Sequence, residues 1–200
     1  MGGRVILHGP GIRAWGCLFI ILSLLLLATC GRENNFGLGD AVGSGGNNLP
    51  GRIAVLYFDG STGSSYALGR EIRRLPGLEY TSGGQDKNDM LALLRGNLEE
   101  LIKGPEPGSP LAPTIPAGTK LLHLEFDKGI ARVVFSKELA LGHWGGSRRE
   151  ELTVYSITNT LTGIPWVEGV RIEIEGEGRR TVAGHLSLDQ VFFYKQDLVK

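Results

Sequence analysis

Cysteine is scarce in this chain, and both copies, Cys17 and Cys30, lie near the N-terminus. The long region after Cys30 therefore contains no disulfide bond and no thiolate metal site. It also lacks a pair of histidines at helical spacing, which is a usual signature of a metal site on a helix. We therefore expect no metal and no other cofactor in this region.

A strong charge of either sign is lacking as well. The chain carries 21 basic and 21 acidic residues, and only Arg4 and Arg13 among them precede Cys30. From Cys30 onward the balance is 19 basic to 21 acidic residues, a net charge of −2. Such a region has no basic patch of the kind that binds nucleic acid, and it offers anionic lipid no clear attraction. We therefore predict no nucleic-acid partner.

One long hydrophobic run is present, and it lies at the N-terminus. Residues 15–28 are apolar apart from one glycine and one serine, and Arg4 and Arg13 precede them. A basic segment followed by a short apolar segment is typical of a secretion signal, and the run is shorter than the roughly 20 residues of a membrane-spanning helix. It ends at Leu27-Ala28-Thr29-Cys30, which resembles the lipobox of bacterial lipoproteins.

The lipobox resemblance implies that residues 1–29 are a signal peptide that is removed, and that Cys30 is acylated, for example with palmitate. Acyl chains then hold the protein to the cell membrane, since each buried CH₂ contributes about 0.8 kcal/mol. An uncleaved signal anchor with a free Cys30 is the alternative, and a cytoplasmic apolar helix fits the flanking charges less well. A lipid anchor and an uncleaved anchor both predict an extracytoplasmic location for the rest of the chain.

Two regions of different composition follow this signal. Residues 30–51 are rich in glycine, asparagine and serine and contain few large apolar side chains. Such a segment cannot offset the entropy lost on ordering, so we predict a flexible tether. Residues 52–197 have the length of one ordinary domain, and we predict that they form a single domain.

Strands are predicted where β-branched and aromatic residues alternate with polar ones or run together between turn signals. They cover residues 53–58, 120–126, 130–135 and 170–175, with a further extended piece at 66–72. Leu122 and Leu124 are expected on the same inward face. The turn Asp127-Lys128-Gly129 joins two strands into a hairpin. Residues 180–185 are expected to pair back on the strand at 170–175.

Two helices are predicted. The first starts after Asn88 or Asp89, and its leucines recur at helical spacing. These leucines are Leu91, Leu94, Leu98 and Leu101. The second begins near Ser147, where Ser147 and Glu150 fit a capping box. The order of elements favours an α+β fold, a mixed β-sheet with two helices on one face.

Four short motifs in the predicted domain are informative as a set. Their sequences are Ile115-Pro116-Ala117-Gly118-Thr119-Lys120-Leu121-Leu122, Gly129-Ile130-Ala131-Arg132-Val133-Val134-Phe135-Ser136-Lys137-Glu138, Asn159-Thr160-Leu161-Thr162 and Gly184-His185-Leu186-Ser187. In this order they resemble the GerMN domain family of sporulation and spore-germination lipoproteins, over residues 53–187. The resemblance implies a fold similar to the ring-building motifs of secretion machines. It also implies an envelope interaction module with no established catalytic activity.

The same resemblance implies structural roles for the residues of its motifs. They are Pro116, Gly118, Thr119, Asn159, Thr160, Leu161, Gly184 and His185. We interpret His185 as a structural hydrogen-bonding residue, because no cysteine or serine nucleophile with a partner acid is visible near it. We therefore predict no catalytic residue and no enzymatic activity.

Three further residues are candidates for binding a partner. His143 and Trp144 lie in the glycine-rich segment 142–149 that precedes the second helix. A loop that leads into a helix can bind an anion, and a plain connector is the alternative. Trp144 and Trp166 flank the second helix and either belong to the core or anchor a partner, since interface hot spots favour tryptophan.

Glu173 and Glu175 share one face of their predicted strand. Paired carboxylates can bind a cation or perform acid–base chemistry. We favour a solvated strand face with arginine neighbours such as Arg179 and Arg180, because charges that alternate with isoleucines are typical of a sheet buried on one side.

These observations favour a lipid-anchored envelope protein that binds another envelope protein, in sporulation, germination or envelope assembly. The rival hypothesis is a cell-wall ligand-binding or accessory enzyme module that uses the segment 142–149 or the pair Glu173 and Glu175. A third hypothesis is a plain spacer or scaffold. The partners predicted from the sequence are the membrane, through Cys30, and envelope protein.

Overall fold

The computed structural model describes residues 52–63, 65–75, 86–176 and 178–200, all within one compact unit. The predicted signal peptide, Cys30 and the tether lie outside these described residues. Within them, no helix combines the length and the apolar character needed to cross a membrane.

The described chain forms two sheets and two long helices. In chain order the elements are β1 (Arg52–Asp59), β2 (Leu68–Leu75), α1 (Lys87–Lys103), β3 (Leu121–Asp127), β4 (Ile130–Phe135), α2 (Glu138–Leu141), α3 (Ser147–Thr162), β5 (Gly169–Ile174) and the short 3-10 helix η1 (Gln196–Leu198). β1 and β2 form an antiparallel hairpin. The other sheet has the order β3-β4-β5, antiparallel between β3 and β4 and parallel between β4 and β5.

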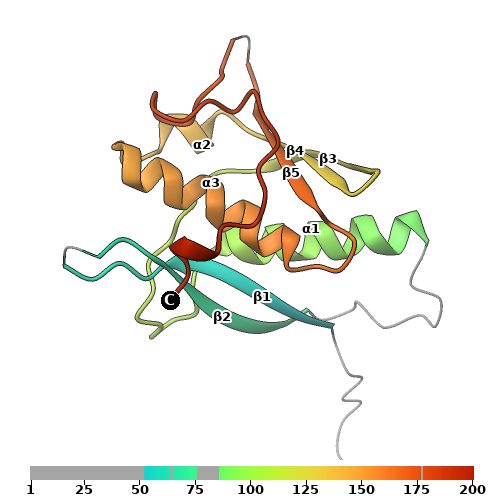
Figure 1. The fold of residues 1–200 in the computed structure, drawn as a ribbon, viewed down its shortest axis with the longest axis horizontal. Helices are drawn as coiled ribbons and strands as arrows, with labels where there is room; N and C mark the ends of the chain where they lie inside the picture. Colours follow the sequence, from blue (N-terminus) through green and yellow to red (C-terminus); the bar gives the residue numbers. More distant parts are fainter. Residues whose placement is uncertain (1–51, 64, 76–85, 177) are drawn as a thin grey trace, which may run out of the picture. The chain divides into compact units, whose positions relative to one another are not determined.

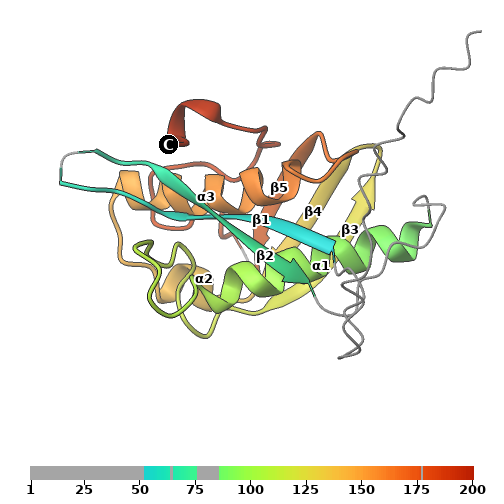
Figure 2. The ribbon, with the colours of Figure 1, turned by 90° about the horizontal axis from the view of Figure 1, so that it is seen from below.

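The elements are layered. α1 and α3 lie side by side between the β1–β2 hairpin and the three-stranded sheet, as both ribbon views show (Figures 1 and 2). The predicted α+β class, with two long helices on one face of a mixed sheet, is confirmed. The β1–β2 hairpin covers the other side of these helices, a position that the sequence patterns do not predict.

The core lies between the helices and the three-stranded sheet. Ala131, Val133 and Phe135 of β4 are fully buried, as the alternation of that strand predicts. Leu94 and Leu98 of α1 are buried against the same cluster. Each such large apolar side chain contributes about 1.5–3 kcal/mol on burial, so this contact fixes α1 on the sheet.

The turn between β3 and β4 lies at the predicted position. Lys128 and Gly129 both have positive φ, 46° and 80°, as a two-residue type I′ hairpin turn requires. The expected alternation is wrong at Leu122, which is exposed although Leu124 is buried. A shift of the β3–β4 register between Leu121 and His123 is the cause, because such a bulge turns the intervening side chain away from the core.

Helix α1 begins earlier than predicted. Its N-cap is Asp86, whose carboxylate accepts a hydrogen bond from the Asn88 amide at 3.0 Å. The predicted caps Asn88 and Asp89 lie within the first turn instead. All three residue types are good caps, so their order in the sequence does not decide between them.

The predicted return strand at 180–185 is wrong. β5 pairs in parallel with β4, and its other neighbour is a single bridge between Val170 and Phe192. Three amides of the intervening segment instead donate to the carboxylate of Glu150. Val182 and Ala183 bind Oε1 at 2.9 and 2.8 Å, and His185 binds Oε2 at 2.8 Å.

Glu150 therefore does not complete the predicted capping box. The N-cap of α3 is Gly146, and no side chain caps this helix. The side chain of Glu150 is 0% exposed, and its carboxylate reaches the segment after β5 rather than the start of its own helix. The segment 182–185 is not paired with a strand. Three hydrogen bonds to the buried Glu150 carboxylate hold it in place instead.

We expect the substitution Glu150→Gln to lower the free energy of unfolding by about 3 kcal/mol. The glutamine amide presents a donor to main-chain donors, so at least one amide loses its acceptor. Urea denaturation of the full chain measures this change. The matched control is Glu151→Gln, which breaks partly exposed ion pairs with Lys195 and Arg148 and is expected to cost about 1 kcal/mol or less. Equal losses for the two variants would contradict the account.

Candidate interaction site

His143 is fixed by a chain of hydrogen bonds in the loop between α2 and α3. The Gly145 amide donates to Nδ1 at 3.0 Å, and Nε2 lies 3.1 Å from the Thr153 hydroxyl. That hydroxyl donates to the carbonyl oxygen of Thr114 at 2.6 Å. Because Nδ1 accepts, Nε2 carries the proton, and the imidazole is neutral. The ring thus ties the loop to α3 and to the segment before β3.

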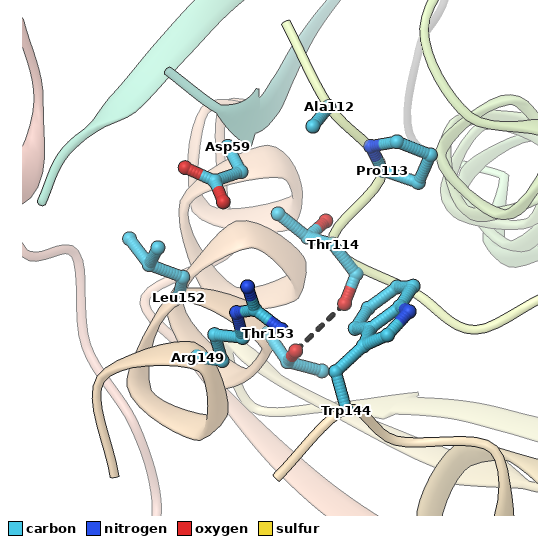
Figure 3. Close-up of a pocket in the computed structure, with 8 residues that line it drawn as sticks. All are labelled: Asp59, Ala112, Pro113, Thr114, Trp144, Arg149, Leu152 and Thr153. Atoms are coloured by element: carbon cyan, nitrogen blue, oxygen red, sulfur yellow. Dashed lines mark hydrogen bonds between the residues drawn. The ribbon is translucent and has the colours of Figure 1, made fainter. Parts of the chain in front are cut away.

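This loop presents Trp144 to solvent. The indole is 49% exposed and lies beside the His143 ring, with 5.8 Å between ring centroids. It borders a cavity of about 270 Å³ (Figure 3). The cavity is lined by Asp59, Ala112, Pro113, Thr114, Trp144, Arg149, Leu152 and Thr153. We call it the Trp144 cavity.

The Trp144 cavity combines three kinds of chemistry. Trp144 offers an aromatic face, Arg149 at the start of α3 offers a cation, and Asp59 at the end of β1 offers a carboxylate (Figure 3). The Oδ1 atom of Asp59 already accepts a hydrogen bond from the Ser61 amide at 2.8 Å, which orients the group. Such a site can hold a planar or apolar group against the indole and a charged or hydroxyl group beside it.

The hydroxyl groups of the Trp144 cavity are already engaged. Thr153 donates to a main-chain carbonyl group, and the Thr114 and Ser156 hydroxyls lie 2.6 Å apart in a hydrogen bond. Neither threonine is paired with a free general base, which nucleophilic catalysis needs. Both threonine hydroxyls are thus held by hydrogen bonds within the protein.

The structure does not bring the two candidate tryptophans together. Trp166 lies in the turn between α3 and β5, is 53% exposed and lines a different cavity. Both indoles are thus surface groups at opposite ends of α3, and neither belongs to the core. Sequence reasoning left this choice open because aromatic side chains serve both purposes.

Part of the site leaves no signal in the sequence. Asp59 and Thr114 come from the end of β1 and from the proline-rich segment before β3. Two main-chain hydrogen bonds between Asp59 and Ala112, at 2.9 and 2.8 Å, join these segments. Nothing in a single sequence signals a contact at that separation. Arg149, by contrast, ends the glycine-rich segment singled out above.

The motif residues before β3 form a tight turn. Pro116 accepts hydrogen bonds at its carbonyl oxygen from the amide and the hydroxyl of Thr119, at 3.3 and 2.7 Å. Gly118, between them, has φ +86°, a value that L side chains rarely adopt. This turn sets the direction of the chain as it enters the sheet.

The motif residues at the end of α3 join separate elements. The Asn159 side chain exchanges two hydrogen bonds with the Lys195 main chain, at 3.1 and 2.9 Å. The Thr160 hydroxyl accepts from the Tyr57 amide of β1 at 3.2 Å, and Leu161 is fully buried in the core. These contacts tie the C-terminal segment and the outer hairpin to one helix.

The motif residues near the C-terminus shape the segment bound by Glu150. Gly184 has φ +95°, and its amide donates to the Thr181 hydroxyl at 3.1 Å. His185 contributes its main-chain amide to Glu150, whereas its ring is exposed.

Glu173 and Glu175 do not form a cation site in the structure. Glu173 is paired bidentately with Arg132 of β4, at 2.7 and 2.6 Å, and Glu175 is exposed. The hydrogen bonds from Arg132 lower the pKa of the Glu173 carboxyl. The arginine that pairs with Glu173 lies on β4, the direct neighbour of β5, and not in the segment 180–185. Among the described residues, no group of three or more His, Cys, Asp or Glu side chains is placed to hold a metal ion.

The layered fold is that of a GerMN-type α+β domain. The tandem GerMN domains of the sporulation protein GerM from Bacillus subtilis share it, with a TM-score of 0.54 and 19% identity over 78% of this chain and 51% of that chain. Residues 55–179 match the Germane family, described as sporulation and spore germination. This match covers more than half of the chain, and the chain belongs to the Germane family. This family is not known for enzymatic activity.

Two further solved structures are similar. The first GerMN domain of GerM has a TM-score of 0.46 and 20% identity, over 73% of this chain and 99% of that chain. A candidate lipoprotein from Clostridium perfringens has a TM-score of 0.49 and 25% identity, over 76% of this chain and 94% of that chain. No curated protein sequence matches this chain.

We expect the stability of the domain to fall in mild acid because of His143. Burial lowers the pKa of its imidazole, and the nearby Glu150 carboxylate opposes this only in part. The unfolded chain then binds the proton more readily than the folded chain, so protonation favours unfolding. The stabilising contribution is complete above about pH 6.5 and is lost as the pH falls through the lowered pKa of the folded state.

Thermal unfolding of the full chain between about pH 7 and about pH 5 measures this effect. His143→Gln, which cannot titrate, is expected to reduce the fall in Tm. His185→Gln removes an exposed ring and is the matched control. If His143→Gln and wild type lose the same Tm over this range, the neutral His143 is not the cause.

Proposed function

We propose that this protein is a lipid-anchored, extracytoplasmic envelope protein whose domain binds another envelope protein. In this proposal Cys30 carries the acyl anchor, and the process served is sporulation, germination or envelope assembly. Membership of the Germane family and the lipobox-like end of the N-terminal hydrophobic run support the proposal.

The single observation that carries a binding role is the exposed indole of Trp144 on a fixed loop. Tryptophan and arginine are the residues most enriched among interface hot spots, and Trp144 lies beside Arg149 at a cavity. Half of a tryptophan side chain offers on the order of 100 Å² of apolar surface to a partner. The hydrogen bonds of His143 fix this loop before a partner binds, which reduces the entropy lost on association.

Photo-cross-linking in cells that express the full chain tests this proposal. A photoreactive amino acid replaces Trp144, and a second variant carries it at the exposed Glu99 of α1 as a matched control. We expect position 144, and not position 99, to give an adduct with one recurrent envelope protein. The mass of the mature N-terminus in the same sample is expected to correspond to acylated Cys30. Equal labelling at the two positions, or none, would contradict a partner at the Trp144 cavity.

A cell-wall ligand is the second candidate, and the lining of the Trp144 cavity favours it. An aromatic face with one cation and one carboxylate is suited to a sugar with charged substituents. A ligand at 100 times its dissociation constant stabilises a fold by about 2.7 kcal/mol. We expect muropeptide fragments to raise the Tm of wild type but not of Arg149→Gln. An unchanged Tm for wild type at saturating fragment concentrations removes this candidate.

A further inference from the structure

The outer edge of β1 is half covered. Every second residue of β1, from Asp59 back to Ile53, directs its amide and carbonyl groups away from β2. Asp59 bonds to Ala112 in both directions, and the Tyr57 amide bonds to Thr160. The next two residues of the series, Val55 and Ile53, have no main-chain hydrogen-bond partner on this side among the described residues. An open edge of this kind is a template for pairing with another strand.

A groove runs beside this open edge. It is a cavity of about 330 Å³ between β1, α1 and the turn that follows α3. Ile53, Val55, Leu93, Ile164 and Trp166 supply much of its lining. An extended chain laid along the edge of β1 would thus find apolar surface for every second side chain.

Trp166 occupies a strained position at this groove. The Val167 amide donates to the Ile164 carbonyl oxygen at 3.2 Å, which closes a tight turn with Trp166 at its third position. Its φ is +78°, where glycine is favoured and a bulky side chain is disfavoured. Burial does not offset this strain, because the indole is 53% exposed. A strained aromatic residue at the mouth of an apolar groove points to a binding role.

The sign of the charge near the open edge is positive. On the outward face of the hairpin, Ile53 is opposite Arg74 and Val55 is opposite Ile72. Ile53 and Ile72 are 64% and 71% exposed. Arg74 is exposed and has no acidic partner among the described residues. A segment that complements this edge therefore alternates apolar residues, which face the groove, with acidic residues, which face outward.

We propose that the edge of β1 binds an extended segment of a partner protein as an added strand. The segment forms main-chain hydrogen bonds with Ile53 and Val55 and places apolar side chains in the groove against Trp166. Its acidic side chains lie near Arg74. This proposal rests on the proposed function, because it gives the chemistry of a protein partner, but it uses a surface separate from the Trp144 cavity.

Fluorescence anisotropy of the full chain in detergent micelles tests the proposal with three labelled peptides. They alternate valine with aspartate, with serine or with lysine. We expect the aspartate peptide to bind at least about tenfold more tightly than the lysine peptide. Added salt is expected to weaken this binding, since exposed charges are screened. Binding of none of the three, or tightest binding of the lysine peptide, would overturn the proposal.

Two variants locate the site. Val55→Pro removes an amide that points away from β2, so the β1–β2 ladder stays intact, and Val55→Ala is its matched control. Trp166→Gly removes the indole and relieves the positive φ, so its Tm is expected to be no lower than that of wild type. We expect each of Val55→Pro and Trp166→Gly to weaken binding of the aspartate peptide about tenfold or more, and Val55→Ala to weaken it less.

Wild-type affinity in a folded Trp166→Gly variant would overturn the proposal, even if Val55→Pro does not fold. Trp144→Ala is expected to bind the aspartate peptide like wild type, and a loss there would assign binding to the Trp144 cavity instead. The two proposals fail separately. A specific adduct at position 144 without peptide binding leaves the proposed function in place and removes only the added strand.

Discussion

At the start of α3, the buried carboxylate of Glu150 accepts hydrogen bonds from three amides of a segment that belongs to no sheet. Removing a carboxylate from water costs several kcal/mol. The hydrogen bonds from these amides offset this desolvation cost only while the segment keeps its position. They hold Val182 in the core, and Leu188 a few residues later is buried as well. The path of the chain after β5 depends on this one charge.

The other polar groups of α3 act in the same way. Thr153 binds the segment before β3, Thr160 binds β1, and Asn159 binds the C-terminal segment at Lys195. The helix thus holds four separate parts of the chain through buried polar side chains, while its apolar residues pack on the sheet. Because these bonds fix both ends of α3, Trp144 and Trp166 can remain exposed on a rigid support.

Local patterns predicted the local parts of the fold. Alternation and the turn at 127–129 gave the β3–β4 hairpin, and helical spacing gave α1 and α3. The bonds of Glu150 were not predictable, because a glutamate three residues after a serine fits a capping box equally well. The return strand predicted at 180–185 was wrong as well, because the amides of this segment bond to Glu150 rather than to β5. The Trp144 cavity was only half predicted, because Asp59 and Thr114 reach it through tertiary contacts that leave no mark on sequence spacing.

The central claim is that the Glu150 carboxylate orders the segment after β5 without strand pairing. Native-state hydrogen exchange of the amides of Val182, Ala183 and His185 tests it most directly. We expect these amides to exchange nearly as slowly as that of Val133 in the central strand, because they open only when the core opens. Exchange as fast as at the exposed Ser187 would contradict the claim.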